Sequence, residues 1–334
     1  MGEESPRAFV DDVWDRVRAG PPDAVEGLID RDLFADRATA AMLPAARAGR
    51  DSFRPDLVVR EPCEYVSAVA AHEAGIPQAQ VGISLAAIER EVLDMVTPTI
   101  ERHGPGVAEA VGAAPYLSSF PASLDPFPWP DTRRFRPPAP PPGALPDWWP
   151  GDDRPLVYVS FGSVVGHLAE AAGVYRTAID AVAELSARVL VTVGRATEVS
   201  RVGPVPANTH VEQWVSQADV VAHAALVVCH GGSGTTFSAL AAGVPLVLCP
   251  LFADQPRNGR VVEAAGAGLV GVSGGDDEAG GLRRLGPADV APLRRAIERV
   301  LGEPSYRRGA ESVSIEMLAA PTLDEVVEGL FSHR

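Results

Sequence analysis

The residues 230–235 combine the types and the spacing that could bind an anion. Within six positions they contain one imidazole (His230), two hydroxyl side chains and three glycines, directly after the apolar run 226–229. A helix is predicted over residues 236–242, because Gly243 and Pro245 stop it. The first N–H groups of a helix lack an internal partner and carry partial positive charge, and glycine lets the backbone approach a phosphate closely. The turn therefore predicts a diphosphate site, although packing in an ordinary α/β domain also uses such turns.

The longer stretch HGGSGTTFSALAAGVPLVLCPLFADQPRN, residues 230–258, closely resembles the signature of glycosyltransferases that use nucleotide sugars to decorate small molecules. The resemblance is strongest from Val157 to Asn258, and it is weaker from Phe53 to Asp125. It implies an α/β protein with two Rossmann-like domains that face each other, the GT-B fold. The likeness is greatest to actinobacterial enzymes that put deoxysugars on antibiotics and related aglycones.

The resemblance implies a role for most polar residues of this region. Asp254 and Gln255 are expected to bind sugar hydroxyls, because a carboxylate accepts hydrogen bonds and an amide both donates and accepts them. Capping of a helix is the alternative for Asp254, and Asn258, one turn on, is a further candidate. The donor diphosphate is expected to be bound at two turns, by Ser163, His230, Gly232, Ser233, Gly234 and Thr235.

The segment EQWVSQ, residues 212–217, resembles the base-binding segment of the same enzymes. Trp214 is expected to stack on a pyrimidine, because an indole offers a large flat face; a buried core tryptophan is the alternative. Val215 and Gln217 are expected to complete the base and ribose site. Ser238 stands where plant members of the family have a glutamate that grips both ribose hydroxyls. Serine there favours a dTDP-sugar, which lacks the 2′-hydroxyl, over a UDP-sugar.

The catalytic base is unknown from the sequence. Inverting transfer to an aglycone hydroxyl needs a base for the hydroxyl proton, and the resembling family uses a histidine in the loop after its first strand. No histidine of this chain stands in a matching context. His103 lies where the family builds acceptor pockets, but we favour an exposed helix end as its explanation. Three functions stay open: an inverting transferase, a catalytically incompetent binding or auxiliary protein, and a sugar-nucleotide epimerase.

The elements that position these residues alternate regularly in residues 151–334, the expected nucleotide-sugar-binding domain. Short apolar runs separated by helices are typical of a parallel sheet covered on both faces. Strands are predicted over residues 156–160, 187–193, 210–212, 226–229, 245–249 and 268–272. Helices are predicted over residues 169–185, 287–301, 305–318 and 322–331, and the last is expected to pack back on the other domain.

Residues 1–125, the expected acceptor-binding domain, show fewer elements. Strands are predicted over residues 55–61, 77–84 and 115–125, with helices over 9–18 and 31–48 and another that reaches His72. A doubly wound half usually has about five or six strands, so we expect this domain to be incomplete, its first part being absent from the chain. Ten prolines between residues 126 and 150 predict a linker without ladder or helix, packed on one domain by Trp148 and Trp149.

Composition narrows the possible partners. The net charge of -15 and the lack of a basic run make nucleic acid and anionic membranes poor partners. The three cysteines are scattered, which excludes a disulfide framework, and two of them lie in apolar runs that predict burial. Neither a signal peptide nor a membrane span is visible, so we expect a cytoplasmic protein. We expect no cofactor beyond the sugar donor and no metal; a homodimer or a role as an auxiliary protein stays open.

Overall fold

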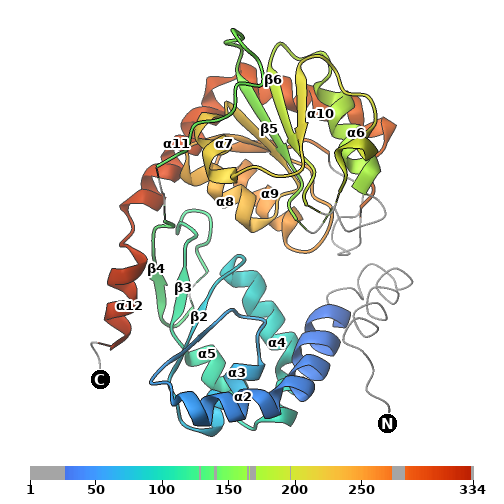
Figure 1. The fold of residues 1–334 in the computed structure, drawn as a ribbon. Helices are drawn as coiled ribbons and strands as arrows, with labels where there is room; N and C mark the ends of the chain where they lie inside the picture. The colour runs from blue at the N-terminus through green and yellow to red at the C-terminus, as the bar shows by residue number, and fades with distance from the viewer. Residues whose placement is uncertain are drawn as a thin grey trace. The chain divides into compact units, whose positions relative to one another are not determined.

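The computed structural model describes residues 27–127, 129–138, 141–163, 165, 171–195, 197–272 and 283–331. The helix expected over residues 9–18 lies outside them. The chain divides into two compact units, with the boundary between Phe135 and Arg136 (Figure 1). Each unit contains a parallel β-sheet. Among the described residues no helix is long and apolar enough to cross a membrane.

The first unit contains a four-stranded sheet in the order β1-β2-β3-β4, and every pair in it is parallel. Parallel neighbours need crossover connections, which helices provide here. Tyr116 and Trp129 stack in the core of this unit, with ring centres 4.9 Å apart. The described elements are η2 (Gly27–Ala38, a π-helix), α2 (Thr39–Phe53), β1 (Val58–Arg60), α3 (Val66–Glu73), β2 (Gln78–Val81), α4 (Ala86–His103), α5 (Val107–Ala113), β3 (Tyr116–Ser118) and β4 (Thr132–Arg134).

Two predictions for this unit need correction. The single helix expected over residues 31–48 is two helices, η2 and α2, and the second extends to Phe53. The proline-rich stretch does hold a short ladder, because β4 lies within it and pairs with β3. Its ten prolines leave residues 131–136 free of proline, so the N–H groups of this segment can donate. Phe135 N–H, for example, donates to Ser118 O at 2.9 Å.

The second unit contains a six-stranded parallel sheet in the order β10-β9-β8-β5-β6-β7. Read from β7, this is the 3-2-1-4-5-6 order of a doubly wound fold, in which ligands bind where the order reverses, beside β5 and β8. The strands are β5 (Leu156–Ser160), β6 (Arg188–Thr192), β7 (Thr209–Glu212), β8 (Leu226–Cys229), β9 (Leu246–Leu248) and β10 (Gly268–Val270). The helices are α6 (Ala171–Val182), η4 (Val199–Val202, a 3₁₀-helix), α7 (Gln217–His223), α8 (Ser233–Ala241), α9 (Gln255–Ala264), α10 (Pro287–Gly302), α11 (Pro304–Ala319) and α12 (Leu323–Phe331).

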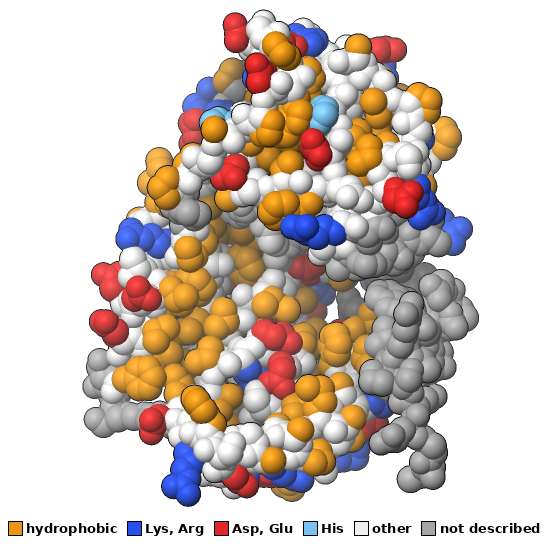
Figure 2. All heavy atoms as spheres, viewed as in Figure 1, with side chains coloured by type: hydrophobic (Ala, Val, Ile, Leu, Met, Phe, Trp, Pro, Cys, Tyr) orange, Lys and Arg blue, Asp and Glu red, His pale blue; other side chains and the backbone are white. Residues whose placement is uncertain are grey.

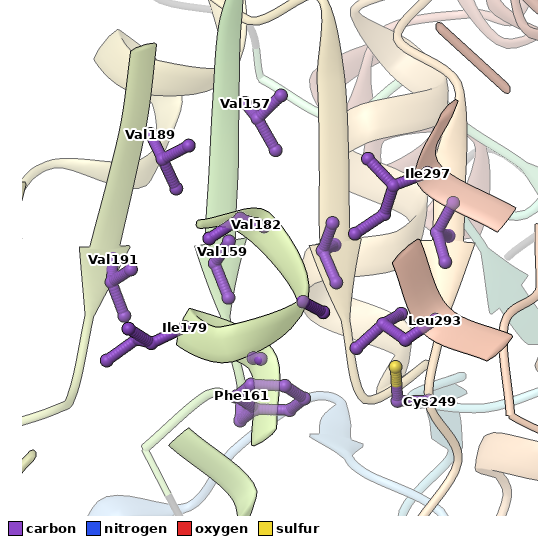
Figure 3. Close-up of a cluster of buried hydrophobic side chains, with 14 of the residues drawn as sticks. Val157, Val159, Phe161, Ile179, Val182, Val189, Val191, Cys249, Leu293 and Ile297 are labelled. Carbon is purple, nitrogen blue, oxygen red and sulfur yellow. The ribbon is translucent and has the colours of Figure 1, made fainter. Parts of the chain in front are cut away.

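Helices cover both faces of this sheet. The crossovers that leave β5 and β8 run in opposite directions along the sheet, and because both are right-handed their helices lie on opposite faces. On one face α6 packs against α10, and on the other face α8 packs against α11 (Figure 1). Between the sheet and the α6–α10 pair, aliphatic side chains such as Val159, Ile179 and Leu293 form a fully buried cluster (Figure 3). Cys229 and Cys249 are buried, as the apolar runs predict. The sheet is therefore a rigid base for the turns at its strand ends.

The last part of the proline-rich stretch packs on the second unit. The Trp148 ring stacks on His210 of β7 at 5.2 Å, and its indole N–H donates to Glu212 at 3.2 Å. Trp149 meets the same histidine edge to face at 6.1 Å. The two tryptophans thus pack this part of the chain against β7 of the second unit. The expectation that the last helix packs on the first domain stays a prediction.

Candidate functional site

A pocket of about 760 Å³ lies at the carboxyl ends of four neighbouring strands of the second unit. The turns after β8, β5, β6 and β7 line it, and this is the place where a doubly wound sheet binds ligands. Its volume falls within the range of small-molecule sites. The predicted residues that line it are Ser163, Trp214, Val215, Gln217, His230, Gly232, Ser233, Gly234 and Thr235. Ser238, Asp254 and Gln255 do not line it.

The imidazole of His230 fits between two glycine turns. A Cβ atom on Gly162 would lie 2.9 Å from His230 Cε1, and one on Gly232 would lie 2.5 Å from His230 Nε2. Gly162 also has a φ of 71°, which other residues rarely adopt. Both glycines are therefore required for the β5 and β8 turns to close on the ring, and any larger residue would displace it.

His230 contributes no positive charge to the pocket at neutral pH. Burial lowers its pKa to about 4, and nearby Asp254 only partly opposes this effect. Its Nδ1 is buried and has no hydrogen-bond partner among the described residues. A neutral imidazole carries one N–H donor, so it can donate a single hydrogen bond to a ligand.

The helix α8 begins at Ser233, three residues earlier than the sequence predicts, and Gly232 is its N-cap. No side chain caps this end, and the N–H of Thr236 is the first that bonds back into the turn, to Gly232 O at 3.1 Å. The N–H groups of the first helical turn therefore remain available at the pocket wall, with the positive end of the helix dipole. This arrangement suits an anionic group.

The hydroxyl groups of the turn are held by neighbouring side chains. Ser233 donates to Asp254 Oδ2 at 2.8 Å, and Thr235 donates to Gln217 Oε1 at 3.1 Å. Asn258 is fully buried and donates both to Asp254 Oδ2 at 2.9 Å and to Gly231 O at 2.9 Å. The sequence singles out Asn258 only as a further sugar-binding candidate; in the structure it ties the β8 turn to α9.

Asp254 and Gln255 lie at the start of α9, and the side chain of Gln255 stabilises the loop between β9 and α9. Asp254 is the N-cap residue of α9, but its side chain makes no cap hydrogen bond; the capping interpretation of that side chain is wrong. Gln255 is 3% exposed, and its Oε1 accepts from the N–H groups of Leu251 at 2.8 Å and Phe252 at 3.2 Å. Their expected contacts with sugar hydroxyls stay a prediction.

Known proteins with similar sequences resolve which family these features belong to. Residues 176–332 match the C-terminal domain family of erythromycin biosynthesis protein CIII-like proteins. The L-demethylnoviosyl transferase of Streptomyces niveus is 28% identical over 302 residues, which are 87% of this chain and 75% of that protein. The TDP-daunosamine transferase DnrS of Streptomyces peucetius is 32% identical over 312 residues, 83% of this chain and 68% of that protein. The chain belongs to the actinobacterial natural-product glycosyltransferases.

A solved structure supports the fold of this glycosyltransferase. The spinosyn rhamnosyltransferase SpnG complexed with thymidine diphosphate superposes with a TM-score of 0.73 at 22% identity, over 89% of this chain and 78% of that one. The predicted GT-B type of α/β fold is thereby confirmed.

The pocket of the glycosyltransferase contains residues that the sequence analysis missed. Arg195 follows β6, and its guanidinium carbon lies 4.3 Å from the ring centre of Trp214. Trp214 is 55% exposed, so the core interpretation of this residue is wrong. Tyr158 and Thr192 share a hydrogen bond of 2.9 Å at the pocket floor. Arg195 could have been found from its place at a strand end, where the other three turns of the site also lie.

In the first unit, Glu89 is a buried acid that the sequence does not reveal. Its Oε1 accepts from the N–H groups of Ile83 and Ser84, both at 2.7 Å. Burial raises the pKa of Glu89 to about 7, against the lowering effect of its hydrogen bonds. His103 is the last residue of α4, as the helix-end interpretation expects, but its side chain is only 16% exposed and lies 3.4 Å from Asp36 Oδ1. The expectation that this helix end is exposed is therefore wrong.

Proposed function

We propose that the chain binds a pyrimidine nucleoside diphosphate sugar in the pocket of the second unit, with a dTDP-sugar preferred to a UDP-sugar. The observation that carries the proposal is the convergence of two features in one pocket. The uncapped N-terminus of α8 suits a diphosphate, and the half-exposed indole of Trp214 suits a base. The thymidine diphosphate of the spinosyn rhamnosyltransferase complex and the TDP-sugar named for the Streptomyces peucetius relative support thymidine as the nucleoside.

We further propose that the chain transfers the sugar, with inversion, to a hydroxyl of a small hydrophobic natural-product aglycone. The names of the relatives support an acceptor of this class, since one is an elloramycin glycosyltransferase and another a tylactone mycaminosyltransferase. Asp254 and Gln255 adjoin the α8 turn and would meet the sugar after a local rearrangement, because Asp254 now accepts from Ser233 and Gln255 from the β9–α9 loop.

A donor-binding or auxiliary role is the second candidate. One observation favours it: among the described residues of the first unit, both histidines are engaged elsewhere, since His103 lies 3.4 Å from Asp36 and His72 bonds to Pro105 O at 3.0 Å. The two roles predict the same donor binding and different turnover.

Transfer is tested by incubating the full chain with dTDP-glucose and a panel of polyketide aglycones, and by determining the anomeric configuration of any product by NMR. Inversion at the anomeric carbon supports the transferase. A product with retained configuration contradicts the proposed mechanism, and donor binding without any product supports the auxiliary role.

A further inference from the structure

The proposed ligand carries more negative charge than the pocket lining has positive charge to balance it. Among the described residues that line it, Arg195 is the only one with a charged side chain at neutral pH, because burial keeps His230 neutral. A nucleoside diphosphate brings at least two negative charges, whereas a helix N-terminus supplies only about half a positive charge. A cation beside the diphosphate would balance the remaining charge.

Arg195 is placed to supply that cation. Its neighbour Gly194 touches the β5 turn, since a Cβ there would lie 3.5 Å from Gly162 O. Gly162 in turn packs against His230, so the arginine belongs to the turn next to the expected diphosphate site. Arg195 makes no ion pair with any described residue, whereas Arg176 and Arg283 of the same unit pair with Asp180 and Asp289.

The present contact of Arg195 is with the other half of the pocket. Its guanidinium lies over one face of the Trp214 ring, 4.3 Å from the ring centre, where it would compete with a base that stacks on that face. A cation–π contact at an exposed ring is weak compared with a charge-assisted pair between arginine and phosphate. A ligand that carries both a base and a diphosphate would therefore gain by displacing the guanidinium from the ring.

We propose that Arg195 pairs with the donor diphosphate, and that in doing so it leaves the face of Trp214 to the nucleotide base. This inference rests on the proposed function of the pocket. The inference predicts opposite effects of Arg195 on the two parts of the ligand. Thymidine alone competes with Arg195 for the indole face, whereas a diphosphate attracts the guanidinium away from that face.

Calorimetric titration of the full chain with thymidine and with dTDP tests the inference, in the wild type, in Arg195→Ala and in Arg201→Ala. Arg201 is exposed, belongs to the same unit and does not line the pocket, so its variant controls for the loss of one positive charge. We expect Arg195→Ala to bind dTDP about 10- to 100-fold more weakly and to bind thymidine at least as tightly as the wild type. Arg201→Ala should match the wild type with both.

A second measurement follows the indole directly. Inorganic diphosphate should change the tryptophan fluorescence of the wild type, and the change should vanish both in Arg195→Ala and in Trp214→Phe. The inference is overturned if Arg195→Ala binds dTDP as well as the wild type, or if it loses thymidine and dTDP by the same factor. A wild type that does not bind dTDP at all would instead refute the proposed function.

Discussion

Ser233 and Asp254 join the turn after β8 to the loop before α9, because the Ser233 hydroxyl donates to Asp254 Oδ2 at 2.8 Å. Ser233 is the first residue of α8, and Asp254 immediately precedes α9. Asn258 donates to the same carboxylate oxygen. The carboxylate thus fixes the start of one helix against the start of the other, and with it the wall of the pocket.

Removal of this carboxylate should loosen the site. We expect Asp254→Ala to lower the free energy of unfolding by about 1–2 kcal/mol, because two donors lose their charged acceptor in a half-buried position. Denaturant unfolding measures the change, and Glu298→Gln, an exposed position on α10, is the control. A double-mutant cycle with Ser233→Ala should show coupling; additive effects of the two variants would mean that the Ser233–Asp254 contact does not stabilise the fold.

Glu89 should make the stability fall as the pH rises. Its pKa is raised from 4.5 to about 7 in the folded chain, so between pH 4.5 and 7 the folded state holds a proton that the unfolded state has lost. The associated stability is present below pH 4.5 and is lost as the pH rises through 7.

The variant Glu89→Gln resembles the protonated form at every pH. We expect it to be about 1–3 kcal/mol more stable than the wild type at pH 8 and nearly equal at pH 4.5. Urea unfolding of both proteins at the two pH values makes the comparison. A difference that does not depend on pH would show that the Glu89 carboxyl titrates at the same pH in the folded and unfolded chains.

Ser238 offers a test of nucleotide preference. It lies on α8 and does not itself line the pocket, but a glutamate at this position is longer and could reach the ribose. Because a carboxylate accepts from both ribose hydroxyls, we expect Ser238→Glu to improve binding of UDP relative to dTDP. Ser238→Gln is the matched uncharged control. An unchanged ratio of the affinities for UDP and dTDP would show that residue 238 does not influence the choice of nucleotide.

His230 should act on the diphosphate as a neutral donor. We expect His230→Ala to weaken dTDP by about 10-fold, the effect of one lost hydrogen bond in a buried site, and to affect thymidine far less. Competition titrations with the two ligands compare the losses. Equal losses would mean that the imidazole does not face the phosphates.

The sequence predicts the second sheet well, because its strands other than β7 (Thr209–Glu212) are short, largely apolar runs with clear ends. The strand β8, for example, is predicted at its observed bounds, since four buried apolar residues end at His230. The start of α8 is missed by three residues, because serine and glycine at positions 233 and 234 are typical of a turn. The strand β4 is missed because the density of prolines hides a proline-free interval of six residues.

The site itself is only partly visible in the sequence. The glycine turn and Trp214 can be recognised from residue types. The pocket, however, arises from the order of strands in the sheet, which places the β6 turn between those of β5 and β7. Arg195 therefore enters the site without any motif of its own. Likewise, the inward bonds of Gln255 depend on the path of the β9–α9 loop.

On the face shown in Figure 2, Arg side chains stand singly or in small groups among acidic ones, without a continuous basic surface.

The central claim is that the pocket of the second unit binds a pyrimidine nucleoside diphosphate. Calorimetric titration of the full chain with dTDP, with UDP as the comparison, tests it most directly. The account predicts one dTDP site per chain with a dissociation constant between about 1 µM and 1 mM, the range in which enzymes usually bind their substrates, and weaker binding of UDP. No binding of dTDP at millimolar concentration would contradict it.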